Sequence, residues 1–200
     1  MEIDSQEKEI SSKYTFKERG SHTVLLYIKK KGQDSMSRMF EGCTKLVEIS
    51  FNPYINTKNL IKIDYMFRDC ISLELIDLSS FNTENVNEMQ FMFYNCTSLT
   101  SINLSNFNTI NVKYMDHMFS NCISLKSIDL SSFNTKNVYD MEHMFHNCSE
   151  IIFIDISNFI TDKEKEYLFS SLPPKGTINI NRNSKNKFYT IPNDWTINYL

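Results

Sequence analysis

Five cysteines are spaced almost evenly along this chain, and that spacing limits the possible fold more than any other feature. The intervals are 27, 26, 26 and 26 residues, between Cys43, Cys70, Cys96, Cys122 and Cys148. A Met-Phe pair ends three residues before each cysteine, and a leucine or isoleucine stands three residues after it. A fixed period of this length is typical of repeat proteins, in which each unit buries its apolar side against its neighbours.

The cysteines have two other interpretations, a disulfide framework and a metal site. Five is an odd number, so complete pairing within one chain is impossible. The sequence has no C-x-x-C pair, the short spacing that zinc sites usually include. We therefore predict one small buried thiol in each unit, reduced and unreactive.

Each unit combines two periodicities. In residues 73–78, Ile76 and Leu78 alternate with Asp77, which predicts a short strand with one buried side. A polar corner follows at 79–83, and its phenylalanine recurs in every unit, as expected for an inward plug. Apolar residues then recur at steps of three and four, which predicts a helix of about two to three turns. The residues of this second pattern are Val86, Met89, Met92, Phe93 and Cys96.

Stacking such units predicts a right-handed α/β solenoid, with parallel strands on one face and short helices on the other. The repeated motif is L-x-x-I-D-L-S-x-F-N-T-x-N-V-x-x-M-x-x-M-F-x-x-C. Over about Met36 to Phe159 it closely resembles the BspA-type leucine-rich repeat. That repeat occurs in surface proteins of bacteria and protists and in lipoproteins of wall-less bacteria. The resemblance implies a leucine-rich solenoid, display on the cell surface and binding to other proteins. It implies no catalytic residues.

The chain is expected to divide into four segments. These are a mobile tail at 1–12, a β-hairpin cap at 13–34, the repeat array at 35–160 with about five 26-residue units, and an irregular C-terminal cap at 161–200. The hairpin is predicted from 14–16 and 24–28, and short strands of the second cap from 177–180 and 188–191. Trp195, the single tryptophan, is expected to seal the open end of the array.

Composition bears on partners and location. A net charge of −3 supplies no positive field for a phosphate backbone, so nucleic acid is not an expected partner. No apolar run approaches the ~20 residues of a membrane helix. The first ten residues are charged and lack the apolar core of a signal peptide, so the sequence as written predicts the cytoplasm, whereas the family resemblance implies the cell surface.

The strands supply the first candidate binding surface. One polar residue per unit lies between two buried ones and is expected to face solvent. We expect a protein partner to bind this column and its strand neighbours: Asp77, Asn103, Asp129, Asp155, Glu74, Thr100 and Lys126. The alternative is that these short polar residues only keep the sheet soluble.

The second candidate surface is a column of aromatic residues, each just before a methionine: Tyr65, Phe91, His117 and His143. Exposed aromatic residues on a rigid array are good anchors for protein contacts, although they can equally pack against the neighbouring unit. His117 and His143 each follow an acidic residue and could share a metal, but a solvated ridge is the favoured interpretation and no metal is predicted. Without a nucleophile–base set or a phosphate loop, we predict no enzyme and no cofactor. We expect a protein-binding module, possible roles being adhesion or surface recognition, or alternatively a scaffold subunit inside the cell.

Overall fold

The computed structural model describes residues 2–3, 6–7, 24–25, 34–51, 53–160, 167–184, 188 and 190–200. The chain forms two compact units, Met1–Gln33 and Asp34–Leu200. In the first unit, β1 (Glu2–Ile3) pairs antiparallel with both β2 (Gln6–Glu7) and β3 (Val24–Leu25). β1 and β2 fall in the stretch expected to be a tail, and β3 falls in one arm of the expected hairpin. The other arm, at 14–16, lies outside the described residues, so the capping role remains a prediction.

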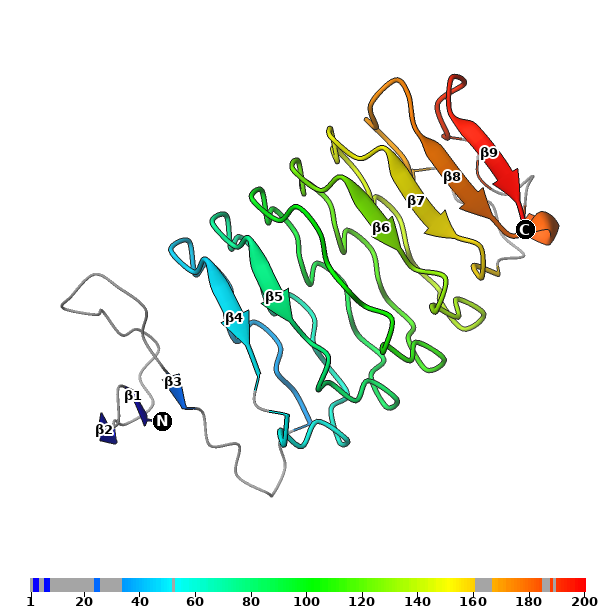
Figure 1. The fold of residues 1–200 in the computed structure, drawn as a ribbon. Coiled ribbons are helices and arrows are strands. Elements are labelled where there is room, and N and C mark those ends of the chain that lie inside the picture. The colour runs from blue at the N-terminus through cyan, green and yellow to red at the C-terminus, as the bar shows by residue number, and fades with distance from the viewer. Residues whose placement is uncertain are drawn as a thin grey trace. The chain divides into compact units, whose positions relative to one another are not determined.

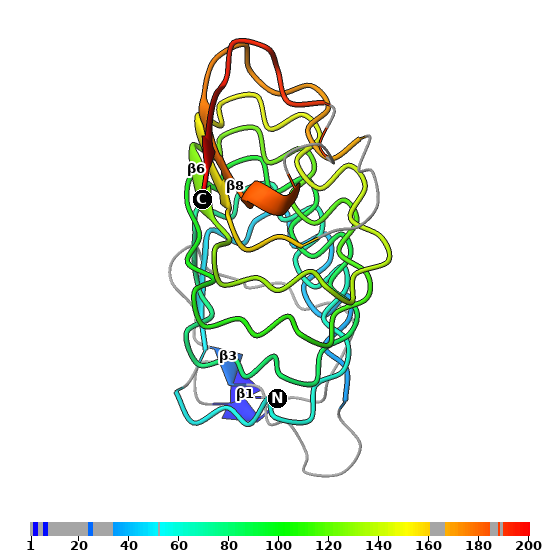
Figure 2. The ribbon, with the colours of Figure 1, turned by 90° about the vertical axis from the view of Figure 1, so that its right-hand side faces the viewer.

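The second unit is a solenoid whose strands lie side by side on one face (Figure 1). β4 (Glu48–Ser50) pairs parallel with β5 (Leu75–Asp77). β6 (Ser127–Asp129), β7 (Phe153–Ile156), β8 (Thr177–Ile180) and β9 (Thr196–Tyr199) form a second parallel sheet. Residues 101–103 follow the same path between the two sheets without forming a regular strand. Viewed from the end, successive coils lie over one another (Figure 2).

The register of the strands follows the sequence repeat. Ile49 is opposite Ile76, and Ile128, Ile154, Ile178 and Ile197 are paired in succession through the second sheet. Ile76, Ile128, Ile154 and Ile178 are buried, while Asp77 and Asp129 in the same strands are exposed. The strand predicted from the alternating pattern is therefore confirmed in the coils of β5 and β6.

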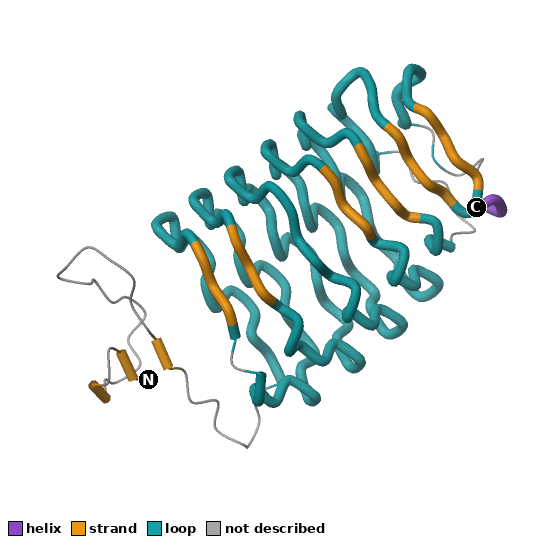
Figure 3. Tube along the Cα trace, in the orientation of Figure 1, coloured by secondary structure: helices purple, strands orange, loops and turns teal. Residues whose placement is uncertain are grey.

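The helices predicted for the other face are wrong for the described residues. The one helical segment among them is a short 3₁₀ helix, η1 (Arg182–Ser184), near the C-terminus (Figure 3). The stretch from Val86 to Cys96, expected to be a helix, is instead a run of tight turns. Its residues at 91 and 95 have φ values of 57° and 60°, which a right-handed helix excludes.

Two kinds of backbone hydrogen bond alternate along this turn face. The N–H groups of Met89, Phe91 and Phe93 donate to carbonyls of the next coil at 2.9–3.0 Å. Those of Met92, Tyr94 and Cys96 donate to the carbonyl three residues earlier in the same coil, at 3.1–3.3 Å. Apolar residues recur at steps of three because the turns repeat at that step, so the pattern resembles one face of a helix.

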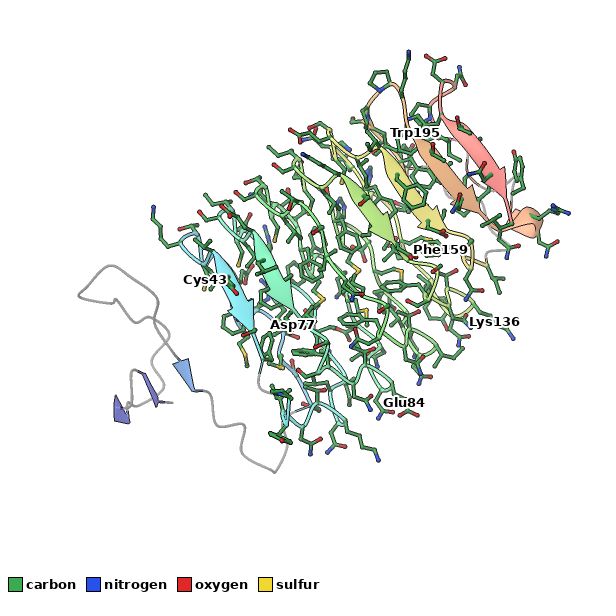
Figure 4. All side chains as sticks on the ribbon, viewed as in Figure 1. Cys43, Asp77, Glu84, Lys136, Phe159 and Trp195 are labelled. Atoms are coloured by element: carbon green, nitrogen blue, oxygen red, sulfur yellow. The ribbon has the colours of Figure 1, made fainter. Side chains whose placement is uncertain are left out.

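Phenylalanines form a continuous stack through the core. Successive rings lie 5.4–5.9 Å apart between centroids and are within 6° of parallel. The stack consists of Phe40, Phe67, Phe93, Phe119, Phe145 and Phe169. The corner phenylalanines are also buried, at 3% exposure or less for Phe81, Phe107, Phe133 and Phe159, as the plug hypothesis predicted. Phe159 is labelled in Figure 4.

Four of the five cysteines form the predicted buried column. Each thiol donates a hydrogen bond of 3.1–3.2 Å to the carbonyl of a stacked phenylalanine in the preceding coil. These residues are Cys70, Cys96, Cys122 and Cys148, and burial raises the pKa of every one of them, to about 12 for Cys70 and Cys148. Cys43 is exposed, so the prediction is wrong there. It lies in the first coil of the second unit.

Within the segment expected to be an irregular cap, β8 and β9 extend the sheet in register. The predicted strand at 177–180 is present as β8, the strand β9 was not predicted, and the predicted strand at 188–191 falls partly outside the described residues. Trp195 is 5% exposed, and its Nε1 donates to the Pro173 carbonyl at 2.9 Å. A Cβ on Gly176 would lie 2.6–2.8 Å from the Trp195 ring, so this close approach requires glycine. The charged stretch at 162–166 lies outside the described residues.

Candidate functional site

The recurring Asn and Thr of the corner have structural roles. Thr83 Oγ1 accepts a hydrogen bond from the Asn108 N–H at 2.8 Å and donates one to the Asn108 carbonyl at 3.1 Å. Thr109 and Thr135 make the same pair of bonds to the next coil. The neighbouring Asn side chains cap local turns or donate to the preceding coil. Only the variable residues of this corner, such as Glu84 and Lys136, project freely (Figure 4).

The polar column on the strands also has a structural role that sequence reasoning missed. The side-chain Oδ1 of Asp77, Asn103, Asp129 and Asp155 accepts a hydrogen bond of 2.9–3.0 Å from the N–H two residues later. This Asx turn ends each strand, and Asx turns are a common role for Asp and Asn. The bond from the Ser79 N–H lowers the pKa of Asp77. The signal was available, because an Asp or Asn recurs just before the polar corner of four successive units, where such residues commonly make this turn.

The remaining predicted strand-face residues stay at the surface. Glu74, Thr100 and Lys126 are exposed, each just before the strand path of its coil. Asp155 is half-buried because its Oδ2 accepts a hydrogen bond from Asn179 Nδ2 at 2.6 Å. Two exposed apolar side chains, Leu75 and Ile152, lie on the same face.

The aromatic residues of the turn face form a second stack at the surface. Ring centroids are 4.6–5.2 Å apart along Tyr65, Phe91, His117, His143 and Tyr167. We call these five residues the aromatic column. The Arg38 guanidinium lies 4.0 Å above the Tyr65 ring and extends the stack by a cation–π contact. Two predictions were open for these residues, packing against the neighbouring unit or exposure to solvent, and each is partly right. The first four rings are half-buried, and Tyr167 is exposed.

A second row of side chains borders the aromatic column. Tyr94 contacts Phe91 and His117, with ring centroids 5.5 and 6.3 Å apart. His146 packs edge-on against His143, and its Nδ1 lies 2.9 Å from Ser170 Oγ. Tyr94 and His146 therefore widen the aromatic surface around the column.

The electrostatics of the turn face are unusual near the histidines. Burial, followed by the nearby His143 and His146, lowers the pKa of His117. Burial, followed by Asp140, raises the pKa of Asp116 to about 6. His117 Nδ1 and Ser120 Oγ are buried and lack a hydrogen-bond partner. Among the described residues, no group of three or more His, Cys, Asp or Glu is placed to hold a metal ion.

The repeat region matches a known protein family. Residues 29–102 and 101–172 each match the family described as "Mycoplasma protein of unknown function, DUF285". The chain belongs to the DUF285 family. No curated protein matches this DUF285 chain significantly.

One solved structure is similar to this DUF285 chain, a leucine-rich repeat protein of T. pallidum. The identity is 19% and the TM-score 0.45, over 71% of this chain. The match covers 64% of the T. pallidum protein, so this chain spans less than two thirds of it. In the part of the chain that the structure describes, no helix is sufficiently long and apolar to cross a membrane.

Proposed function

We propose that this DUF285 protein is a non-enzymatic protein-binding module, and that the aromatic column is the centre of its binding surface. One observation supports this choice: five stacked rings run along the turn face and remain partly exposed. Stacking fixes the rings in place, so little conformational entropy is lost when a partner covers them. Aromatic residues of this kind dominate the energetics of protein interfaces.

The strand face is the second candidate. It carries the predicted residues Glu74, Thr100 and Lys126, and Leu75 and Ile152 are 56% and 60% exposed. Its Asp and Asn column is already bonded to the backbone, which leaves fewer free acceptors for a partner. The resemblance to BspA-type repeats favours a role in adhesion or surface recognition, and a scaffold role in a larger assembly is the alternative.

Two matched substitutions test which surface binds. Tyr94→Glu places a charge beside the aromatic column, and Leu75→Glu places the same charge on the strand face. Full-length proteins with each change are used to capture partners from extracts of the source cells, after thermal unfolding has shown that both fold. We expect Tyr94→Glu to lose partners that the parent retains and Leu75→Glu to keep them. The reverse result would move binding to the strand face, and equal capture by all three would contradict the proposal.

A further inference from the structure

Two exposed tyrosines shortly precede the histidines of the aromatic column along the chain. Tyr114 and Tyr139 are 42% and 63% exposed, and their ring centroids lie 6.2 Å apart at a tilt of 58°. Their backbones are held by the turn-face ladder, in which the Tyr139 N–H donates to the Lys113 carbonyl at 2.9 Å. These rings present polarisable faces to solvent on a rigid support.

Three acidic residues, Asp116, Asp140 and Glu142, belong to the same two neighbouring coils as these tyrosines. Asp140 is the ladder partner of Tyr114, and the His117 N–H donates to the carbonyl of Glu142, which places neighbouring coils side by side. Asp140 and Glu142 both act on Asp116 and help to raise its pKa. The charges of Asp140 and Glu142 therefore reach the Asp116 carboxylate, which lies in the neighbouring coil.

Among the described residues these carboxylates form no ion pair with lysine or arginine, unlike Glu41 and Glu88 of earlier coils, although Asp140 Oδ1 accepts a hydrogen bond from the Glu142 N–H at 2.9 Å. Glu88, in the same column as Asp140, pairs with Lys62 at 2.8 Å. Glu41 pairs with Arg38 and Arg68. Within the described ranges, Asp116, Asp140 and Glu142 form no ion pair. The nearest lysine along the chain, Lys113, forms no ion pair within those ranges either.

Resting on the proposed function above, we propose that this surface binds an arginine-rich segment of a protein partner. We name it the tyrosine patch: Tyr114, Tyr139, Asp116, Asp140 and Glu142. Guanidinium groups stack on tyrosine rings and bond carboxylates in pairs, so one side-chain type matches both components. A negative surface of this kind repels nucleic acid and acidic peptides.

Peptide binding to the full-length chain tests the proposal. The probe is a fluorescein-labelled peptide of alternating arginine and serine, followed by fluorescence anisotropy, with a glutamate–serine peptide of equal length as the negative probe. We expect the arginine peptide to bind and the glutamate peptide not to bind. Failure of the arginine peptide to bind would overturn the proposal, whereas the Tyr94→Glu capture experiment would still decide the broader function.

A charge-matched pair of variants shows whether binding is local. Asp140→Asn with Glu142→Gln removes two negative charges from the patch. Asp77→Asn with Asp129→Asn removes two from the strand face and retains the Asx turns, since Asn103 makes the same turn. We expect the patch variant to bind the arginine peptide about tenfold or more weakly, and the strand variant to change binding by less than about twofold. Equal losses would show a general charge effect and overturn the assignment.

The aromatic part of the site has its own test. Tyr114→Ser with Tyr139→Ser removes both rings and leaves all charges in place. We expect weaker binding of the arginine peptide, and a smaller loss with a lysine–serine peptide, because lysine stacks less well on aromatic rings. Unchanged binding of the arginine peptide would contradict the role of the tyrosines.

Discussion

At the residue scale, short polar side chains replace backbone partners that the irregular corners cannot supply. A chain that turns sharply leaves buried N–H and C=O groups without a regular ladder, and such groups are costly when unpaired. Thr83, Thr109 and Thr135 are each 2% exposed or less, and each satisfies one N–H and one carbonyl of the following coil. The recurrence of F-N-T in the sequence therefore reflects a requirement of the fold.

Removing one of these hydroxyl groups should destabilise the array. Thr83→Val keeps the shape of the side chain and leaves the Asn108 N–H and carbonyl unpaired. We expect the free energy of unfolding to fall by about 1–3 kcal/mol, measured by chemical denaturation. Thr100→Val, at an exposed position, serves as the control and should change it by less than about 0.5 kcal/mol. Equal stability of the two variants would mean that Thr83 is not bonded as described.

At the scale of the element, the turn face shows why apolar spacing was a poor guide to backbone conformation. Steps of three and four residues occur both in a helix and in consecutive tight turns. The deciding feature is the left-handed residue at Asn95, Asn121 and Asn147, just before each cysteine. Asparagine tolerates this conformation, and its recurrence there was a signal against a helix. The second left-handed position in each unit is that of the aromatic column. Its residues Tyr65, Phe91, His117 and His143 give no such signal.

The cysteine column provides a test of this element. Burial raises the pKa of its four thiols, so few of them are in the reactive thiolate form. We expect a thiol reagent to modify Cys43 quickly in the native protein and the other four thiols at least about a hundredfold more slowly. The reason is that these four react only after a local opening, and an opening that costs ~3 kcal/mol slows the reaction by about that factor. The change in absorbance of the reagent counts the thiols.

Two controls accompany the thiol count. Cys43→Ser should abolish the fast phase, and denaturant should make all remaining thiols react together. Fast modification of two or more thiols in the native parent would show that the coils open independently, contrary to the packing described here.

At the scale of the whole molecule, columns of like residues couple each coil to the next. Hydrogen bonds from the turn and corner positions join residues about one repeat apart in sequence, and ring stacks continue through successive coils. In such an array each unit is stabilised mainly by its neighbours. A charge that appears within one column therefore affects the stability of the array and not only of one coil.

Protonation of His117 should lower stability in mild acid. His117 has a lowered pKa in the folded protein, so the unfolded imidazole, near 6.5, binds a proton more readily. The stabilisation is complete above pH 6.5 and is lost progressively as the pH falls from there through the lower pKa of the folded state. Asp116 acts in the opposite direction, because its raised pKa of about 6 favours the protonated form in the folded state as the pH falls.

The variant His117→Phe isolates the histidine contribution. Phenylalanine occupies the same position at 91, so the stack is retained, and Asp116 is present in both proteins and cancels in the comparison. We expect the free energy of unfolding to fall less in the variant than in the parent between about pH 8 and about pH 5. Denaturation curves at each pH provide the measurement. Parallel pH profiles would show that His117 is not the titrating group.

The sequence by itself determined the repeat length, the register of the strands and most of the buried positions, although not the exposure of Cys43. These follow from a period that recurs in every unit and from alternation of apolar and polar residues, as at Ile76 and Asp77. Only the tertiary structure decided that the second face is built from turns, that Asp77 caps its own strand, and that the aromatic column stacks. The physical reason is that these features depend on hydrogen bonds and ring contacts between coils, and sequence spacing records which residues are equivalent but not which atoms meet.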